Sequence, residues 1–423
     1  MDSSLNPLVS SLTPSLTVAA ADRARRLKES GVDVIPLAAG EPDFPTPAAA
    51  AAAGIRAIEE GDTRYGPNAG TSALRSAIAR KLREENGLAW AAPENVVVSN
   101  GAKQSVWQAL LATCGPGDDV IVPAPYWTSY PEMARLTGAR PVTFRAGDAS
   151  NGYKVTPEQL RAVLGAHPRA RALVLCSPSN PTGSVYSASE LGALAAVVAE
   201  HPRLLVVADE IYELIRYTGS PPTSFAALPG MAGRTLTVNG FSKAFAMTGW
   251  RLGYLAAPKT YAQAANAVQS QTASGPSTVA QRAGLAALTE LGPRGGEAVR
   301  AMVEAFARRR DVLAAALRAV PGVALPTLPE GAFYLFPDVS ALVGPGARGR
   351  VADGDGDDAW VDVPDAAALV DYLLQAARVA AVPGAAFGAP ECVRFSYAAS
   401  DAEIDDAAKR IAQALAPERY VRP

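Results

Sequence analysis

The sequence predicts an α/β protein in which a mostly parallel sheet is flanked by helices and a smaller α+β domain is attached. Three observations lead to this fold class. Short apolar runs rich in β-branched residues alternate with longer helical patterns through the middle of the chain. Several of those runs are continuously hydrophobic, as strands covered by helices on both faces must be. Near residue 295 the alternation ends, and a long helical stretch leads into a segment of different character.

The strands and helices expected of the sheet follow one another in a regular order. Strands are expected at 95–99, 119–122, 171–176, 203–208, 235–238 and 251–257. Helical stretches are expected at 71–86, 102–114, 187–200 and 259–271. This alternation is typical of a doubly wound sheet, whose ligands bind beyond the carboxyl ends of the strands.

The chain is expected to divide into three parts. Residues 1–50 would form an N-terminal arm and part of the small domain, 51–295 the large ligand-binding domain, and 296–423 the small C-terminal domain. A long helix with apolar residues at helical spacing is expected from about Glu297 to Val320.

Residues 341–362 are expected to be a surface insertion, with a solvated loop at 344–358, GPGARGRVADGDGDD. The loop contains a GxGxxG match, but a dinucleotide site needs a strand before it and a helix after it. Its acidic run imitates a calcium loop but lacks the glycine at the sixth place and the glutamate at the twelfth. Neither motif predicts a site.

Composition excludes several function classes. The 39 basic residues are balanced by 41 acidic ones, so no excess of positive charge is available for nucleic acid or an anionic bilayer. No apolar run approaches the roughly 18 to 20 residues of a membrane span. The first residues show neither a secretory signal nor a transit peptide. The three cysteines, Cys114, Cys176 and Cys392, form no CxxC pair, so we expect a reduced compartment and no metal site.

The stretch TVNGFSKAFAMTGWRLGY, residues 237–254, carries the strongest signal for chemistry. It contains Lys243, with Ser242 directly before it and Arg251 shortly after it. A lone lysine is usually a surface residue. Small and apolar neighbours indicate instead that Lys243 points into a pocket, where loss of solvent lowers the amine pKa and makes it a competent Schiff-base nucleophile.

Polar segments follow three other predicted strands. Asp209 and Tyr212 come after strand 203–208, SPSNPTG with Asn180 follows strand 171–176, and NGAK opens a helix after strand 95–99. A helix cap, a β-turn and a helix start could explain these segments one at a time. Their coincidence at strand ends favours one shared site, with an anion held at the start of the helix.

Ten motifs occur in order along the chain: LAAGEPDFPTP, YGPNAG, NGAKQ, PYWTSYPEM, SPSNPTG, DEIY, SKAFAMTGWRLGY, GAFYLF, VPGAAFG and VRFSYAAS. Together they resemble the fold-type I pyridoxal 5′-phosphate (PLP) enzymes, and within these the class I aminotransferases of subgroup Iβ. The resemblance runs from about Pro14 to Leu415. VSNGAKQS and CSPSNPTGSVY are most similar to the plastid enzymes of plants and algae that transaminate both aspartate and prephenate.

The resemblance implies a role for each matching residue toward PLP. Lys243 would carry the cofactor and then serve as the general base and acid. Asp209 would keep the ring nitrogen protonated, so that the ring acts as an electron sink. Tyr212 and Asn180 would bond the 3′-oxygen, and Trp127 would stack on the ring.

The resemblance also implies a phosphate site. The phosphate would be held by the amides of Ala102 and Lys103, by Arg251, and by Tyr65 of a second subunit in a homodimer with shared sites. Many relatives have a hydroxyl three residues before the lysine, where this chain has Gly240. Ser242 is the hydroxyl next to the lysine, and whether it contacts the phosphate stays open.

For the substrate, the resemblance implies that Arg394 grips the α-carboxylate in a bidentate pair, assisted by the Gly40 backbone and Asn180. Residues 268–276 contain no cation for a second carboxylate. Lys103 is the candidate replacement, with Ser15 and Thr17 closing over the ligand.

The expected activity is transamination of aspartate with 2-oxoglutarate, and of prephenate to arogenate with glutamate or aspartate as donor. The resemblance implies the chloroplast stroma as the compartment, with the cytoplasm as the alternative. Two other hypotheses stay open. A PLP-dependent lyase, decarboxylase or cyclase could use the same fold, and a PLP-binding transcription regulator would need a DNA-binding domain before the Pro14 motif.

Overall fold

The computed structural model describes residues 5–352 and 358–423. Its largest sheet has seven strands in the order β1-β7-β6-β5-β4-β2-β3. The strands are β1 (Val96–Ser99), β2 (Asp119–Ala124), β3 (Arg140–Arg145), β4 (Ala170–Cys176), β5 (Leu205–Asp209), β6 (Thr235–Gly240) and β7 (Gly253–Ala256). Strands β3, β2, β4, β5 and β6 run parallel, whereas β7 is antiparallel to both β6 and β1. The mostly parallel sheet is confirmed.

All six predicted strands are present, but β3 was not predicted. It pairs only with β2, at the edge of the sheet, and its residues are exposed or half-buried. An edge strand with a solvated face has no continuous apolar run. The sequence signal that identifies the central strands is therefore missing from RPVTFR.

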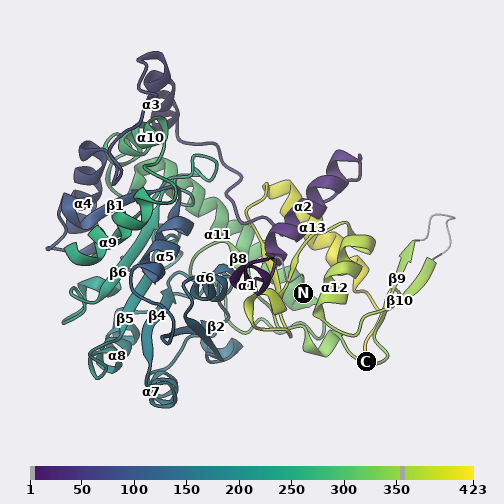
Figure 1. Ribbon diagram of the computed structural model, residues 1–423. Coiled ribbons are helices and arrows are strands. Elements are labelled where there is room, and N and C mark those ends of the chain that lie inside the picture. Colours follow the sequence, from purple (N-terminus) through teal and green to yellow (C-terminus); the bar gives the residue numbers. More distant parts are fainter. Residues whose placement is uncertain (1–4, 353–357) are drawn as a thin grey trace.

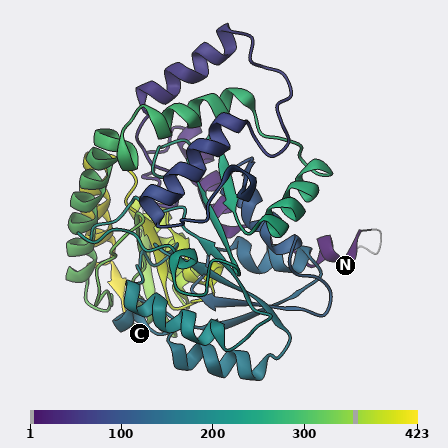
Figure 2. The ribbon, with the colours of Figure 1, turned by 90° about the vertical axis from the view of Figure 1, so that its left-hand side faces the viewer.

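Helices cover both faces of this sheet (Figure 2). Neighbouring residues of one strand enter different cores: Leu205 and Val207 of β5 pack in one apolar cluster, and Val206 and Ala208 pack in another. Burial on both faces explains why the central strands are hydrophobic throughout. The helices are α3 (Ala48–Glu59), α4 (Ser72–Asn86), α5 (Ala102–Leu111), α6 (Ser129–Leu136), α7 (Pro157–Ala166), α8 (Ala188–Ala199), α9 (Lys259–Ser270) and α10 (Thr278–Thr289).

The long helix is confirmed as α11 (Gly296–Ala319), near the centre of Figure 1. The C-terminal third contains α12 (Ala366–Tyr372), α13 (Asp401–Ala414) and two three-stranded sheets, β11-β12-β8 and β10-β9-β13. Ile35 and Leu37 share an apolar cluster with α11 and α13. The N-terminal helices α1 (Pro7–Ser10) and α2 (Leu16–Glu29) lie beside these elements in Figure 1.

The solvated loop expected at 344–358 is wrong for part of its length. Strands β9 (Arg348–Ala352) and β10 (Asp358–Asp362) pair in antiparallel register, and β9 also pairs with β13 (Tyr420–Val421). Gly349 faces Tyr372 so closely that a Cβ would lie 2.3 Å from the tyrosine ring. A glycine that the composition suggested was a loop residue is thus a packing requirement. Residues 353–357 lie outside the described residues.

The remaining strands of the C-terminal third are β8 (Tyr334–Leu335), β11 (Val382–Pro383) and β12 (Val393–Ser396). In the described ranges 5–352 and 358–423, no helix is both long and apolar enough to cross a membrane. Over the same ranges, no group of three or more His, Cys, Asp or Glu side chains could hold a metal ion.

Candidate active site

A cavity of about 420 Å³ lies at the carboxyl ends of the central strands. Cys176 at the end of β4 is in register with Asp209 at the end of β5, which in turn is in register with Val238 of β6. The sheet therefore delivers three successive loops to one place. Most of the predicted site residues line this cavity: Thr17, Gly40, Ala102, Lys103, Trp127, Asn180, Asp209, Tyr212, Ser242, Lys243, Arg251 and Arg394.

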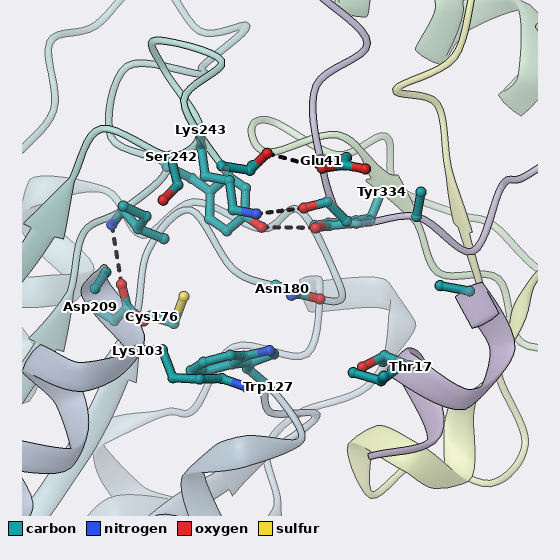
Figure 3. Close-up of a pocket in the computed structure, with 18 of the residues that line it drawn as sticks. Thr17, Glu41, Lys103, Trp127, Cys176, Asn180, Asp209, Ser242, Lys243 and Tyr334 are labelled. Atoms are coloured by element: carbon teal, nitrogen blue, oxygen red, sulfur yellow. Dashed lines mark hydrogen bonds between the residues drawn. The ribbon is translucent and has the colours of Figure 1, made fainter. Parts of the chain in front are cut away.

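Lys243 extends into the cavity from the turn after β6 (Figure 3). Its Nζ donates a hydrogen bond to the carbonyl oxygen of Gly40, a residue of the chain between α2 and α3. Although the side chain is half-buried, the cavity walls exclude enough water to lower the amine pKa to about 8. Loss of solvent is the largest cause of this value; Glu41 and Asp209 oppose it, and the positive charges of Arg394 and Arg251 act in the same direction as the loss of solvent. An amine of this pKa has a substantial neutral, nucleophilic fraction near neutral pH.

Steric crowding explains why position 240, three residues before Lys243, is a glycine. Gly240 is paired with Gly253 of β7, and a Cβ at position 240 would lie 2.8 Å from the Gly253 Cα. A Cβ on Gly253 would in turn lie 2.3 Å from the amide nitrogen of Ala102. Strands β6 and β7 therefore pass directly under the start of α5, where a hydroxyl side chain at position 240 has no room. Ser242 is buried and lines the cavity instead.

Asp209 is only 4% exposed and forms the far end of the cavity. The Tyr130 hydroxyl donates to its Oδ2 at 2.7 Å, and the amide of Ile211 donates to its Oδ1 at 3.2 Å. Burial raises the pKa of the carboxyl group to about 6, and these two donors oppose the rise. Asp209 is thus a buried, oriented carboxylate that would gain from a cationic partner.

Arg394 lies on β12 and is 2% exposed. Its guanidinium donates to the Asn180 side-chain oxygen at 3.0 Å and to the Ala38 carbonyl at 2.9 Å. Its Nε is buried and has no hydrogen-bond partner among the described residues. The guanidinium also lies over the Tyr334 ring, with its carbon 4.4 Å from the ring centroid. A buried cation with an unused donor is ready to accept a carboxylate.

The start of α5 and Arg251 lie next to each other at the cavity. The helix has no side-chain cap, and its first residues, Ala102 and Lys103, line the cavity. Gly101 brings the chain so close to Arg251 that a Cβ would lie 2.6 Å from the guanidinium. An uncapped helix start beside a guanidinium is an environment that favours an anion.

Lys103 and Trp127 form a wall of the cavity opposite Lys243 (Figure 3). The Lys103 Nζ lies 5.1 Å from the centroid of the Trp127 ring. Burial and the positive charge of Arg251 lower the pKa of Lys103, although its side chain keeps contact with solvent. Among the described residues, no carboxylate forms a salt bridge with Lys103. Thr17 approaches the same wall from α2 (Figure 3).

Two predicted residues lie elsewhere. Ser15 is the N-cap of α2: its Oγ accepts from the Val18 amide at 3.4 Å and lies 2.9 Å from the Thr17 hydroxyl. It therefore orients the helix that carries Thr17 and does not line the cavity. Tyr65 does not line it either and is fully exposed.

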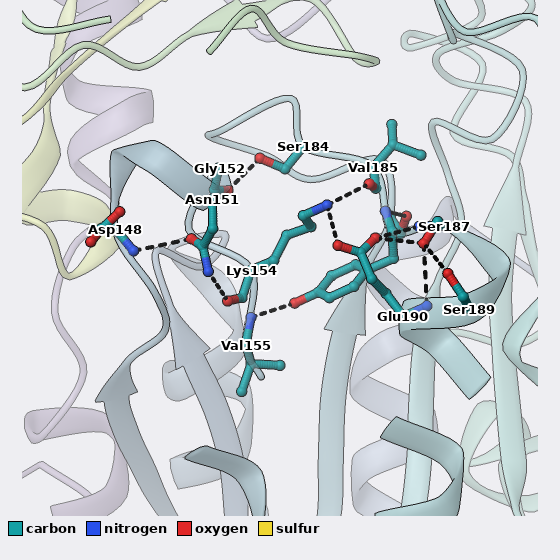
Figure 4. A network of polar contacts seen from close by, with 12 residues as sticks. Asp148, Asn151, Gly152, Lys154, Val155, Ser184, Val185, Ser187, Ser189 and Glu190 are labelled. Atoms are coloured by element: carbon teal, nitrogen blue, oxygen red, sulfur yellow. Dashed lines mark hydrogen bonds and ion pairs between the residues drawn. The ribbon is translucent and has the colours of Figure 1, made fainter. Parts of the chain in front are cut away.

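A polar network supports the residues that follow the Asn180 loop (Figure 4). Lys154 forms an ion pair with Glu190 of α8 at 2.5 Å. The Tyr186 hydroxyl accepts from the Val155 amide at 2.8 Å, and the Ser184 hydroxyl donates to the Gly152 carbonyl. Chain segment 152–155 thus fixes residues 184–190, which follow the loop.

Sequence reasoning missed several cavity residues. Tyr130 and Tyr334 stand inside the quoted motifs PYWTSYPEM and GAFYLF, and Glu41 stands inside LAAGEPDFPTP. The Tyr334 hydroxyl is hydrogen-bonded to the Tyr212 hydroxyl, with 2.8 Å between the two oxygens. The motifs were the available signal, but only the fold tells which of their aromatic residues face the cavity.

Cys176, interpreted from the sequence as a core residue, lies at the cavity wall. Its thiol donates to the Pro178 carbonyl at 3.3 Å, and burial raises its pKa to about 12. It therefore remains a neutral thiol and not a nucleophile. All three cysteines are free.

Fold and cavity define an enzyme built around a reactive lysine, an anion site and a buried carboxylate at the strand ends of an α/β sheet. The family model for aminotransferases of class I and II matches residues 32–411. The chain belongs to this family.

Individual relatives agree with the family. The chain is 54% identical to the "bifunctional aspartate aminotransferase and glutamate/aspartate-prephenate aminotransferase" of Petunia hybrida, over 98% of this chain and 83% of that protein. It is 43% identical to the aspartate/prephenate aminotransferase of Cereibacter sphaeroides, over 96% of this chain and 97% of that one. Its fold matches the solved aspartate aminotransferase of Thermus thermophilus with maleate, with a TM-score of 0.87, 41% identity, and coverage of 97% and 99%.

Proposed function

We propose that the protein is a PLP-dependent aminotransferase for dicarboxylic substrates. It would convert aspartate and 2-oxoglutarate to oxaloacetate and glutamate, and prephenate to arogenate with glutamate or aspartate as donor. The observation that carries this proposal is the arrangement of charges in one cavity. Lys243, Asp209, the start of α5 and Arg251 line it, and so do two further cations, Arg394 and Lys103.

The residues fit PLP by their chemistry. A phosphate matches the uncapped start of α5 and Arg251, an aldehyde matches the low-pKa amine of Lys243, and a protonated ring nitrogen matches the buried carboxylate of Asp209. Tyr212 and Asn180 line the cavity and would donate to the ring oxygen, and Trp127 would be the stacking surface. When bound, PLP supplies an electron sink for the bond broken at the substrate Cα.

The chain's own residues then divide the work. Arg394 binds the substrate α-carboxylate, for which its unpartnered Nε is available. Asn180, already bonded to Arg394, keeps the guanidinium in place. Lys243 would remove the proton from the substrate Cα and later deliver it to C4′, the aldehyde carbon of the cofactor, since its pKa near 8 suits both directions of transfer.

Dicarboxylate preference rests on Lys103. Its amine shares the cavity with Arg394 and has no carboxylate partner among the described residues, so a second substrate carboxylate can occupy that place. The relatives support this proposal. The Petunia hybrida enzyme is named for aspartate and prephenate, and the Thermus thermophilus structure contains maleate, itself a dicarboxylate.

Lys103→Met tests the substrate assignment. We expect kcat/KM for aspartate and prephenate to fall by roughly 1.5 to 3 kcal/mol, because one charged hydrogen bond is lost. Alanine as amino donor should lose much less. Lys259→Met, an exposed change at the start of α9, is the control. Equal losses for alanine and aspartate would show that Lys103 does not bind the distal carboxylate.

Assembly into a homodimer with shared sites is the second part of the proposal. The exposed Tyr65 would reach the phosphate site of a second copy. Tyr65→Phe should weaken PLP binding by roughly 1.5 to 3 kcal/mol, the value of one hydrogen bond to a charged group.

A hybrid of two variants makes this test decisive. When Tyr65→Phe chains are mixed with Lys243→Ala chains, each heterodimer contains one site with both native residues. That site should regain wild-type PLP affinity in a titration followed by absorbance. A hybrid that keeps the weakened affinity, or a fully active monomer, would contradict shared sites.

The compartment is also a proposal. The likeness to plastid enzymes favours the chloroplast stroma, and relatives from Petunia hybrida and Pinus pinaster support a plant-type enzyme. Fractionation of native cells, with an antibody against the protein, distinguishes the stroma from the cytoplasm.

The alternative reaction is a PLP-dependent lyase or cyclase on the same fold. Arg394 and Lys103 favour transamination, because the compounds that exchange the amino group, such as aspartate, glutamate and 2-oxoglutarate, each carry two carboxylates, one for each cation. Mixing the enzyme with glutamate alone should convert the cofactor to its pyridoxamine form, read as a loss of visible absorbance. A product released without that conversion would support the alternative.

A further inference from the structure

Residues 38–46, which we call the strap, run along the cavity between α2 and α3 and serve both catalytic cations. The carbonyl of Ala38 accepts from Arg394 at 2.9 Å, and the carbonyl of Gly40 accepts from the Lys243 amine. Gly40 itself is fitted closely, since a Cβ there would lie 3.1 Å from the Tyr334 hydroxyl. The position of the strap therefore sets where the Lys243 amine rests.

One side of the strap is tied to the loop that follows Lys243. The Thr248 hydroxyl donates to the Glu41 carboxylate at 2.9 Å, the upper dashed contact in Figure 3. Further along, the Thr46 hydroxyl donates to the Ala246 carbonyl at 3.1 Å and accepts from the Trp250 indole at 2.9 Å. Three hydrogen bonds thus join the strap to the loop around the lysine.

The other side of the strap is tied to the C-terminal third. Asp43 accepts from the Arg309 guanidinium at 2.8 Å, and Arg309 also donates to Asp401 at the start of α13 at 2.5 Å. The ring of Phe44 meets that of Phe306 edge-on, with centroids 5.6 Å apart. The strap is held on α11 by these contacts, so its Glu41 carboxylate has a defined place beside Lys243.

Four charged side chains act on the Lys243 amine. The groups that face it are two cations, Arg394 on β12 and Arg251 on the loop after Lys243, and two anions, Glu41 on the strap and Asp209 at the end of β5. Asp209 is assigned to the cofactor ring, so its charge is engaged once PLP is bound. Glu41 faces the amine in the apoenzyme together with Asp209, and it is the anion left for the amine after substrate has released Lys243 from the bound cofactor.

We propose that Glu41, held in place by Thr248, is a positioning residue that works with the Gly40 carbonyl to hold the free amine of Lys243 in the cavity and to favour its protonated form, the form that returns a proton. The inference rests on the proposed function, because that function makes Lys243 both the attachment point and the proton carrier. The Gly40 carbonyl and the Glu41 carboxylate have different roles. The carbonyl fixes the direction of the amine, and the carboxylate offsets the two arginines that discharge it.

The test measures how fast apoenzyme takes up PLP at different pH values, because uptake requires the neutral amine of Lys243. The wild-type rate should rise through a midpoint near pH 8, the pKa of the amine. Glu41→Gln keeps an oxygen for Thr248 but removes the charge. Its midpoint should move down by about 0.3 to 0.5 pH unit, the effect of one solvent-screened charge in the same cavity, with uptake about twofold faster at pH 7.

Three further variants sharpen the result. Thr248→Val frees the carboxylate to turn toward solvent and should move the midpoint in the same direction by less. Glu41→Asp keeps the charge and should lie between wild type and Glu41→Gln. Glu304→Gln, an exposed change on α11 away from the cavity, should leave the midpoint unchanged.

A Glu41→Gln midpoint equal to that of Glu304→Gln would overturn the inference, even if turnover or melting temperature changed. Failure of the proposed function would look different. In that case Lys243→Ala would still take up PLP with the same visible absorbance, and no midpoint near pH 8 would exist to be shifted.

Discussion

The two walls of the cavity are built in different ways. The wall proposed for the cofactor comes from the ends of neighbouring strands, with Asp209 and Lys243 following β5 and β6 of one sheet. The wall proposed for the substrate comes from segments far apart in sequence, with Thr17 on α2, Gly40 on the strap and Arg394 on β12. The first wall is fixed by backbone hydrogen bonding, whereas the second depends on how the N-terminal and C-terminal parts of the chain come together.

The two walls also differ in how many of their polar groups already have hydrogen-bond partners. Asp209 has two donors, and Tyr212 is bonded to Tyr334. Arg394 keeps a buried Nε without a partner among the described residues. A satisfied wall suits a cofactor that stays, and an unsatisfied wall suits a substrate that comes and goes, because the ligand supplies the missing partners.

The largest effect is expected on the cofactor wall, from Lys243→Ala. Without a primary amine the protein should lose the visible absorbance of covalently bound PLP and nearly all turnover. The fold should persist, since among the described residues the amine makes one hydrogen bond, to Gly40. Absorbance spectra, circular dichroism and a coupled transamination assay check this, with Lys259→Ala as the control. Turnover near the wild-type level would show that Lys243 does not carry the cofactor, and the assignment of one wall to the cofactor would then be wrong.

Sequence alone predicted the cofactor wall better than the substrate wall, and the reason is physical. Strands buried on both faces are continuously apolar, so their ends, and the polar residues after them, can be located by pattern. The edge strand β3 lacks that pattern and was missed. Tyr130 could not be selected over Tyr126 from PYWTSYPEM, because only the turn into α6 directs its hydroxyl to Asp209.

The substrate wall carries less local signal. Ser15 and Thr17 both belong to PSLT, yet the helix that begins between them makes one a cap and the other a wall residue. The strap contacts of Glu41 join residues about two hundred positions apart, which no local pattern records. Tyr65 stays a prediction, since its expected target belongs to a second copy of the chain.

A smaller effect is expected from Tyr130→Phe, which keeps the ring but removes the donor to Asp209. The hydroxyl opposes the rise in the Asp209 pKa, so its loss should move that pKa above the present value of about 6. Asp209 must be ionised to pair with a protonated ring nitrogen. PLP affinity therefore falls as pH drops through the Asp209 pKa, and in the variant this fall should begin at higher pH.

Titration of apoenzyme with PLP between pH 5 and 8 measures the Tyr130 effect. At pH 8, where Asp209 is ionised in both proteins, the loss should be about 1 to 1.5 kcal/mol for one hydrogen bond. Tyr126→Phe, which removes a hydroxyl that has no hydrogen bond to Asp209, is the matched control. Identical pH profiles for Tyr130→Phe and wild type would show that the cofactor wall does not depend on this donor.

The smallest effect is expected on the substrate wall, from Thr17→Val. Valine keeps the branched shape, so the change removes one neutral hydroxyl that faces the cavity beside Trp127 (Figure 3). We expect a loss of about 1 kcal/mol in kcat/KM for aspartate, and a larger loss for prephenate, whose ring must be oriented as well as matched in charge.

Ser15→Ala distinguishes the effect of the Thr17 hydroxyl from the effect of the position of α2. Because the Ser15 hydroxyl caps α2 and contacts the Thr17 hydroxyl, its removal should lower the melting temperature more than Thr17→Val does, while affecting kcat/KM less. If Ser15→Ala instead costs as much kcat/KM as Thr17→Val, then the placement of α2, and not the hydroxyl of Thr17, determines how this wall recognises its substrate.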